Sequence, residues 1–225
     1  MFTPTQCAVI FDLDGVIVDS SQQHFESFVA LGKEVGYAMD RARFANIFGR
    51  RNEEIFPMLL GPQLSREEVQ HLADRKEELF RDRIRGQVEP LPGVTELLPA
   101  LKAAGFHLAI GSSTPPKNIE LILTELGFKA YFLAIVSGDD VSKGKPDPEV
   151  FVTAANRLGV PPAQAVVIED AVAGVEAAKN GGMHALGVTT NHPRESLHKA
   201  DRVVDSLAEV APADFLALIN GVAVP

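Results

Sequence analysis

The chain has 225 residues, of which 46% are hydrophobic and 23% charged, and these fractions exclude a disordered or collagen-like protein. Its formal net charge of −9 disfavours general binding of nucleic acid, which depends on basic residues. The one cysteine, Cys7, excludes an internal disulfide and a thiolate zinc cluster. Because there is no basic, apolar leader and no apolar run of about 20 residues, we expect a cytoplasmic protein with no membrane partner.

The first 90 residues contain one predicted strand followed by helices. The apolar run at residues 8–11 predicts a buried strand. Capping signals near Ser20 and at Ser65 predict two helices, the second of which continues to about Arg85. No clear strand pattern occurs between them, so we expect residues 18–90 to form an all-helical cap domain inserted after the first strand.

From residue 91 onward, predicted helices and strands alternate. We expect helices at 94–104, 116–126, 147–158 and 171–180, and strands at 107–111, 132–136, 165–168, 185–188 and 202–204. Such alternation is typical of βαβ units, whose strands are parallel. Residues 1–17 and 91–225 are therefore expected to form one α/β core with a Rossmann-like parallel sheet.

Polar residues follow four of the predicted strands. In open parallel sheets, ligands bind beyond the carboxyl ends of the strands. We therefore expect one site to contain Asp12, Asp14, Ser112, Ser113, Lys145, Glu169 and Asp170.

The residue types at this predicted site point to phosphate chemistry. Four carboxylates, from Asp12, Asp14, Glu169 and Asp170, are unstable together without a cation or raised pKa values, and Mg²⁺ prefers such oxygen ligands. Serine hydroxyls and a lysine donate hydrogen bonds to phosphate oxygens. Asp12 is then placed as a nucleophile that forms an aspartyl phosphate, and Asp14 as the general acid and base.

These residues also resemble a known family. The runs Asp12–Val16 and Glu169–Gly174, with Ser112 and Lys145-Pro146 between them, are similar in order and spacing to the four motifs of the haloacid dehalogenase superfamily. The resemblance covers about residues 8–188 and is strongest to the β-phosphoglucomutase-like phosphatases and mutases. It implies a helical cap on a parallel-sheet core, and it implies that the cap residues facing the substrate are His24, Arg51, Asn52 and Lys76.

Two enzymatic reactions and one inactive state remain open from the sequence. Departure of an alkoxide needs an acid such as Asp14, whereas departure of a halide does not, so we expect phosphoester chemistry rather than dehalogenation. We favour a Mg²⁺-dependent phosphatase for small phosphorylated metabolites, most of all sugar phosphates, acting as a monomer or weak homodimer. One alternative is a β-phosphoglucomutase, whose second phosphate would be held by Arg50, Arg51, Thr114, Lys117 and Asn118. The other is a catalytically inactive binding module.

Overall fold

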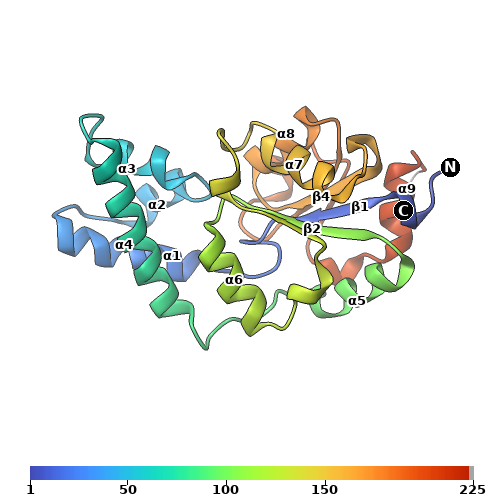
Figure 1. Ribbon diagram of the computed structural model, residues 1–225, viewed down its shortest axis with the longest axis horizontal. Coiled ribbons are helices and arrows are strands. Elements are labelled where there is room, and N and C mark those ends of the chain that lie inside the picture. Colours follow the sequence, from blue (N-terminus) through green and yellow to red (C-terminus); the bar gives the residue numbers. More distant parts are fainter. Residues whose placement is uncertain (223–225) are drawn as a thin grey trace.

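The computed structural model describes residues 1–222, in which six strands form one parallel sheet (Figure 1). The strands are β1 (Ala8–Phe11), β2 (His107–Gly111), β3 (Ala134–Val136), β4 (Ala165–Glu169), β5 (His184–Val188) and β6 (Arg202–Val204). Their order across the sheet is β3-β2-β1-β4-β5-β6. Phe11 at the end of β1 lies opposite Ile110 of β2 and Ile168 of β4. This register places the residues that follow these three strands side by side.

Helices cover both faces of the sheet. One face carries α5 (Val94–Ala104), α6 (Pro116–Glu125) and α9 (Pro212–Ile219), and the other carries α7 (Glu149–Leu158) and α8 (Val172–Asn180) (Figure 1). Alternate residues of β1 point to opposite faces: Val9 and Phe11 pack with the first group of helices, Ala8 and Ile10 with the second. Because both faces are covered, the strand is a continuous apolar run rather than an alternating one.

The segment between β1 and α5 forms a separate group of helices, at left in Figure 1. These are α1 (Ser21–Val35), α2 (Arg41–Ile47), α3 (Asn52–Leu60) and α4 (Arg66–Ile84). They share their own hydrophobic cluster, to which Phe28, Phe44 and Phe56 contribute. The two chain segments that connect this cap to the core lie together, since Val18 bridges to Pro90.

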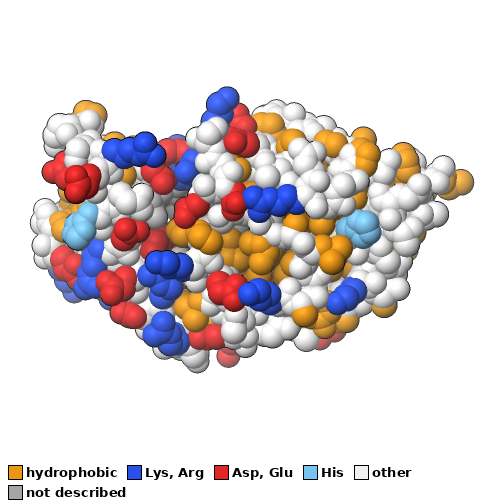
Figure 2. Space-filling model, viewed as in Figure 1, with side chains coloured by type: hydrophobic (Ala, Val, Ile, Leu, Met, Phe, Trp, Pro, Cys, Tyr) orange, Lys and Arg blue, Asp and Glu red, His pale blue; other side chains and the backbone are white. Residues whose placement is uncertain are grey.

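The outer surface of the cap is highly charged but balanced. Residues 40–90 contain ten basic and ten acidic side chains. Figure 2 shows both signs interspersed over the cap, whereas hydrophobic side chains gather nearer the middle of the same face. Pairs such as Arg75 with Glu34 and Glu78, at 2.8 and 2.5 Å, account for much of this pattern as a solvated surface.

The expected fold class, a parallel α/β core with a helical cap after the first strand, is confirmed. The structure differs in detail at β3, which begins at Ala134 rather than at residue 132, because residues 129–131 form a 3₁₀ turn and Leu133 is 70% exposed. Helix α9 was not predicted. The exact division of the chain at residues 18 and 90 stays a prediction. Among residues 1–222, no helix has the length and apolarity that crossing a bilayer requires.

Candidate active site

A cavity of about 320 Å³ lies where the ends of the central strands face the cap. Its core side is lined by all the predicted core residues: Asp12, Asp14, Ser112, Ser113, Lys145, Glu169 and Asp170. Its cap side includes His24, Arg50, Asn52 and Lys76. The predicted convergence of the strand ends therefore occurs in the structure.

Three buried carboxylates form the floor of this cavity. Asp12 directly follows β1, Glu169 ends β4, and Asp170 is the next residue; one ligand atom from each lies within 4.8 Å of the others. The Asp12 amide donates to the Ile168 carbonyl at 3.0 Å, which fixes the position of Asp12 over the sheet edge. Asp170 accepts a 2.7 Å hydrogen bond from Asn191 Nδ2.

Two glycines allow these carboxylates to approach the backbone. A Cβ atom on Gly15, whose φ is +83°, would lie 2.2 Å from Asp170 Oδ2. A Cβ atom on Gly174 would lie 1.8 Å from Glu169 Oε1. Neither distance is sterically possible, so both positions require glycine while the carboxylates keep their places.

Lys145 is the cation of the floor. Its Nζ lies 3.0 Å from Asp12 Oδ1 and donates to Glu169 Oε1 at 2.6 Å, while Glu169 Oε2 accepts from the Ala171 amide at 2.9 Å. When all three carboxylates are ionised, the one ammonium leaves an excess of two negative charges in a buried place.

The electrostatics of the floor fit a divalent cation. Burial raises the pKa of Asp12 to about 7, and the charges of Glu169 and Asp14 add to this effect while Lys145 opposes it. Burial, together with the charges of Glu169 and Asp12, also raises the pKa of Asp170 well above its ordinary value. Oxygen ligands with an uncompensated double charge are the donor set that Mg²⁺ and similar ions take.

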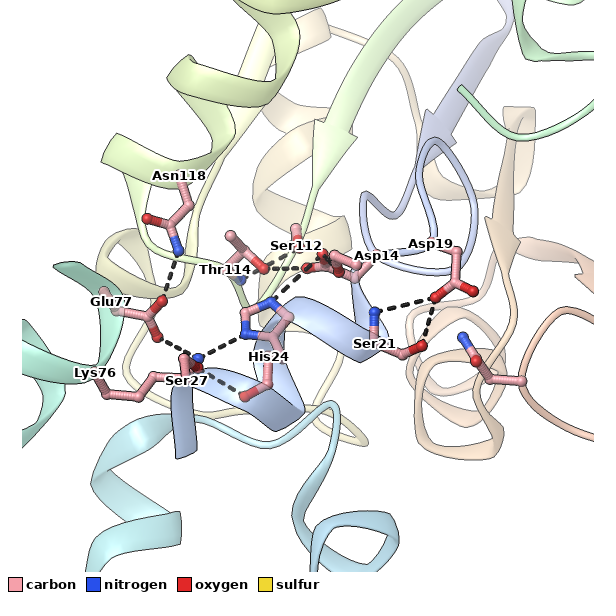
Figure 3. Close-up of polar contacts among 12 residues, drawn as sticks. Asp14, Asp19, Ser21, His24, Ser27, Lys76, Glu77, Ser112, Thr114 and Asn118 are labelled. Carbon is pink, nitrogen blue, oxygen red and sulfur yellow. Dashed lines mark hydrogen bonds and ion pairs between the residues drawn. The ribbon is translucent and has the colours of Figure 1, made fainter. Parts of the chain in front are cut away.

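Asp14 occupies a different environment from Asp12. Its carboxylate accepts hydrogen bonds from the Ser20 and Thr114 hydroxyls, and His24 Nε2 lies 3.7 Å from its Oδ1 (Figure 3). Burial acts to raise its pKa, but the contact with His24 and the hydrogen bonds from Ser20 and Thr114 outweigh burial and lower the pKa to about 2. Its side chain is not among the three clustered carboxylates, and its predicted role as a metal ligand stays a prediction.

The loop after β2 places hydroxyl groups beside the acidic floor. Ser112 is buried, its amide donates to the Val136 carbonyl at 3.0 Å, and its Oγ accepts from the Thr114 amide at 3.2 Å. Its hydroxyl hydrogen therefore remains available for a ligand in the cavity. Ser113 lines the same cavity and is partly exposed.

The structure places three of the four predicted cap residues at the cavity. His24, Asn52 and Lys76 line the cavity. Arg51 instead lies in neighbouring grooves, where its side chain packs near Gly144, and Arg50 takes its place at the cavity.

Several residues at the site were missed by sequence reasoning. They include Ser20 as a partner of Asp14, Glu77 beside Lys76, Asn191 as a partner of Asp170, and His192 at the cavity. Asn191 and His192 follow β5, so the strand-end argument could have found them. Nothing in the local pattern marks Glu77, whose partner Asn118 is 41 residues away.

Comparisons with known proteins agree with this geometry. A family model described as haloacid dehalogenase-like hydrolase matches residues 9–188. The chain is 35% identical to β-phosphoglucomutase from Bacillus subtilis, a match that covers 83% of this chain and 84% of that protein. It is 31% identical to the phosphorylated carbohydrates phosphatase from Thermotoga maritima, with 96% and 99% covered.

The solved structure of β-phosphoglucomutase from Clostridium difficile superimposes with a TM-score of 0.86 at 29% identity, and 98% of each chain is covered. Sheet and cap therefore share one architecture with that enzyme. The chain belongs to the haloacid dehalogenase-like hydrolases, which confirms the family expected from the four motifs and identifies it as an enzyme.

Proposed function

We propose that the chain hydrolyses phosphomonoesters of small sugars, through an aspartyl phosphate on Asp12 and with Mg²⁺ as its cofactor. The observation that carries the proposal is the grouping of three buried carboxylates with Lys145 and the Ser112 hydroxyl at the end of β1. Asp12, Glu169 and Asp170 would hold the cation, which when bound would offset the negative charge shared by the phosphate and Asp12.

Asp12 is the nucleophile in this proposal. One of its carboxylate oxygens bonds to phosphorus while the bond from phosphorus to the sugar oxygen breaks. Lys145 and the serine hydroxyls donate to the phosphate oxygens and so orient the phosphorus for in-line attack by Asp12. Water then attacks the aspartyl phosphate, which releases inorganic phosphate and regenerates the Asp12 carboxylate.

Asp14 is the acid and base. The departing alkoxide takes a proton from Asp14, and the attacking water later returns one. Without substrate, the lowered pKa of Asp14 favours its ionised form, and its carboxylate accepts from two hydroxyls. When the leaving oxygen of a bound phosphate ester replaces Thr114 as its partner, Asp14 loses a donor and gains a nearby negative charge. Both changes raise its pKa toward the range in which it carries the proton.

The side chains beside the cavity favour hydrolysis over the mutase reaction. A mutase must bind a second phosphate, and Asn118 and Lys117 were candidates for that task. Asn118 is buried, with its Nδ2 donating to Glu77 and its Oδ1 accepting from Arg81. Lys117 is exposed and lines a neighbouring groove, not the cavity. Of the five residues considered for a second phosphate, Arg50 and Thr114 line the cavity, whereas Arg51, Lys117 and Asn118 do not. This incomplete set supports water, rather than a second sugar phosphate, as the acceptor in our proposal.

The first test is phosphate release from an aryl phosphate, measured with and without Mg²⁺. We expect turnover that requires the ion and that Asp12→Asn abolishes. Full activity of Asp12→Asn would overturn the assignment of the nucleophile, and no turnover with any phosphomonoester would favour the inactive binding module.

A second test separates phosphatase from mutase. The enzyme is supplied with β-glucose 1-phosphate and a bisphosphate primer, and both products are measured. We expect inorganic phosphate. Glucose 6-phosphate formed without net phosphate release would establish the mutase instead. The cytoplasmic location, the monomeric or weakly dimeric state and the absence of a nucleic-acid partner stay predictions.

A further inference from the structure

A buried chain of polar contacts leaves the core, passes through the cap and returns to the core at Asp14 (Figure 3). It begins at Asn118 of α6, whose Nδ2 donates to Glu77 Oε2 at 2.6 Å. Lys76 Nζ donates to Glu77 Oε1 at 2.9 Å and contacts His24 Nδ1 at 2.7 Å. His24 Nε2 then faces Asp14 Oδ1 at 3.7 Å. Two helices of the cap, α4 and α1, are thus joined to two segments of the core.

Two side chains that can only donate hydrogen bonds determine which atom donates and which accepts at each of these contacts. Arg81 donates to Asn118 Oδ1 at 2.9 Å, so the amide of Asn118 must turn its nitrogen toward Glu77. The ammonium of Lys76 has no acceptor, so its contact with His24 is a hydrogen bond only when Nδ1 carries no proton. The ring proton of neutral His24 is then on Nε2, the nitrogen that faces Asp14.

The contacts are enclosed, so no solvent replaces a lost partner. Lys76 is 3% exposed, Glu77 5% and Asn118 0%. The ring of His24 stacks on Phe80 with centroids 3.9 Å apart, which leaves rotation of the ring restricted. A buried ion pair such as Lys76–Glu77 is weak evidence for stability, because desolvation offsets most of the attraction. The main effect of this pair is to fix the position of the Lys76 ammonium.

We propose that Glu77 and Asn118 are positioning residues for the acid–base group. They hold Lys76 against His24 Nδ1, which keeps the His24 proton on Nε2 and directed at Asp14. This inference rests on the proposed function, since it assigns the two residues to the step in which Asp14 transfers a proton. Because Asn118 lies in the core and Glu77 in the cap, the chain is complete only when the cap is seated on the core.

Reciprocal variants test the Glu77–Asn118 contact. Glu77 Oε1 accepts from both Lys76 and Asn52, so Glu77→Gln keeps its oxygen there and places its amide nitrogen opposite the donor of Asn118. Asn118→Asp places a carboxylate opposite Glu77, so each single change breaks the contact. The double variant restores it in the reverse direction: the new amide nitrogen donates to the new carboxylate, whose other oxygen still accepts from Arg81. If a single variant folds poorly, comparison of the double variant with the wild type still tests the contact.

The kinetic measurement compares two leaving groups. A nitrophenolate leaves with little help from an acid, whereas an alkoxide needs the proton of Asp14. We expect each single variant to lower kcat for an alkyl monophosphate such as glycerol phosphate about tenfold more than kcat for p-nitrophenyl phosphate, a fraction of a full acid–base contribution. Asp14→Asn should show the same selectivity more strongly, and the double variant should return to near the wild-type ratio.

A spectroscopic measurement follows the proton itself. The ¹⁵N chemical shifts of His24, assigned by comparison with His24→Gln, should report an Nε2-protonated ring in the wild type and in the double variant. Both single variants should show a mixture of tautomers. Arg75→Gln, on the exposed surface of the same helix, removes the ion pairs with Glu34 and Glu78 and should change neither the tautomer nor the leaving-group ratio.

The outcomes separate this inference from the function on which it rests. If Asp12→Asn keeps its turnover, the proposed function is wrong. If Asp12→Asn is inactive but the single variants lower kcat for both substrates equally and leave the His24 tautomer unchanged, Glu77 and Asn118 form only a structural contact. Failure of the double variant to recover the leaving-group ratio would likewise overturn the positioning role.

Discussion

On the core side of the cavity, the functional groups come from the ends of parallel strands, whereas on the cap side they come mostly from within or beside helices. Asp12, Ser112 and Glu169 are brought together by the register of β1, β2 and β4. His24 and Lys76 are brought together by the packing of α1 on α4. The strand register therefore fixes the positions of the charged groups on the floor of the cavity. The positions of the cap residues depend instead on how the cap packs against the core.

The largest effect should come from the cation of the floor. Lys145→Met removes the ammonium that lies against Asp12 and Glu169. We expect kcat to fall by about 10³-fold, as for the loss of a donor to developing negative charge. Lys143→Met is the matched control in the same loop, because Lys143 is 71% exposed. Equal losses in the two variants, measured by phosphate release, would contradict a special place for Lys145.

The raised pKa of Asp12 predicts a pH-dependent stability of the metal-free protein. The folded state retains this proton up to about pH 7, whereas the unfolded chain releases it near 3.8. The folded state thus binds more protons between these values, so the free energy of unfolding should fall as pH rises from about 4 to 7, by about 4 kcal/mol at most.

Urea denaturation of the wild type and Asp12→Asn, both in chelator, measures this effect as a difference between the two proteins. Excess Mg²⁺ at pH 7 should restore the stability of the wild type, because it compensates the floor once Asp12 is ionised. A difference that is the same at pH 4 and pH 7 would show that burial does not raise the pKa of Asp12.

Adding one methyl group at Gly174 should displace a carboxylate of the cavity floor. A Cβ atom on Gly174 would displace the Glu169 carboxylate from Lys145. Replacing a helical glycine by alanine ordinarily stabilises a protein by about 0.5–1 kcal/mol. Here we expect Gly174→Ala to weaken the apparent affinity for Mg²⁺ and to lower kcat about tenfold to a hundredfold, in line with loss of support around a metal ligand. A Mg²⁺ titration of activity with unchanged midpoint and kcat would contradict this arrangement of Glu169.

The smallest effect should appear on the cap side of the cavity. Arg50 lines the cavity but its side chain is 51% exposed and pairs with Glu54 at 3.5 Å, so its contribution to substrate binding should be about 1 kcal/mol or less. Arg50→Gln should raise KM for a sugar phosphate by about fivefold or less. Arg51→Gln should leave KM unchanged, since Arg51 lies outside the cavity. The reverse result would restore the assignment made from sequence.

This contrast also explains what could be predicted from the sequence. Asp12, Ser112, Lys145 and Glu169 follow predicted strands, and one rule about parallel sheets brings them to one place. The helix ends at Gly36 and Gly105 could also be predicted, because both residues have the positive φ that glycine permits.

The cap contacts depend on packing that no local pattern encodes. Glu77 and Asn118 are 41 positions apart and meet only because α4 lies beside α6. Arg50 and Arg51 are adjacent and alike, so the choice between them depends on the rotation of the loop before α3. Ser20 was expected only as a helix cap, whereas its hydroxyl donates to Asp14.

Whether Asp12 carries the phosphoryl group can be measured by quenching the enzyme with acid during turnover. The enzyme is mixed with Mg²⁺ and a sugar phosphate, quenched, digested and measured by mass spectrometry. We expect one added phosphoryl group on the peptide that contains Asp12 and none on the same peptide of Asp12→Asn. A phosphoryl group on a different residue, or undiminished phosphate release by Asp12→Asn, would contradict this role of Asp12.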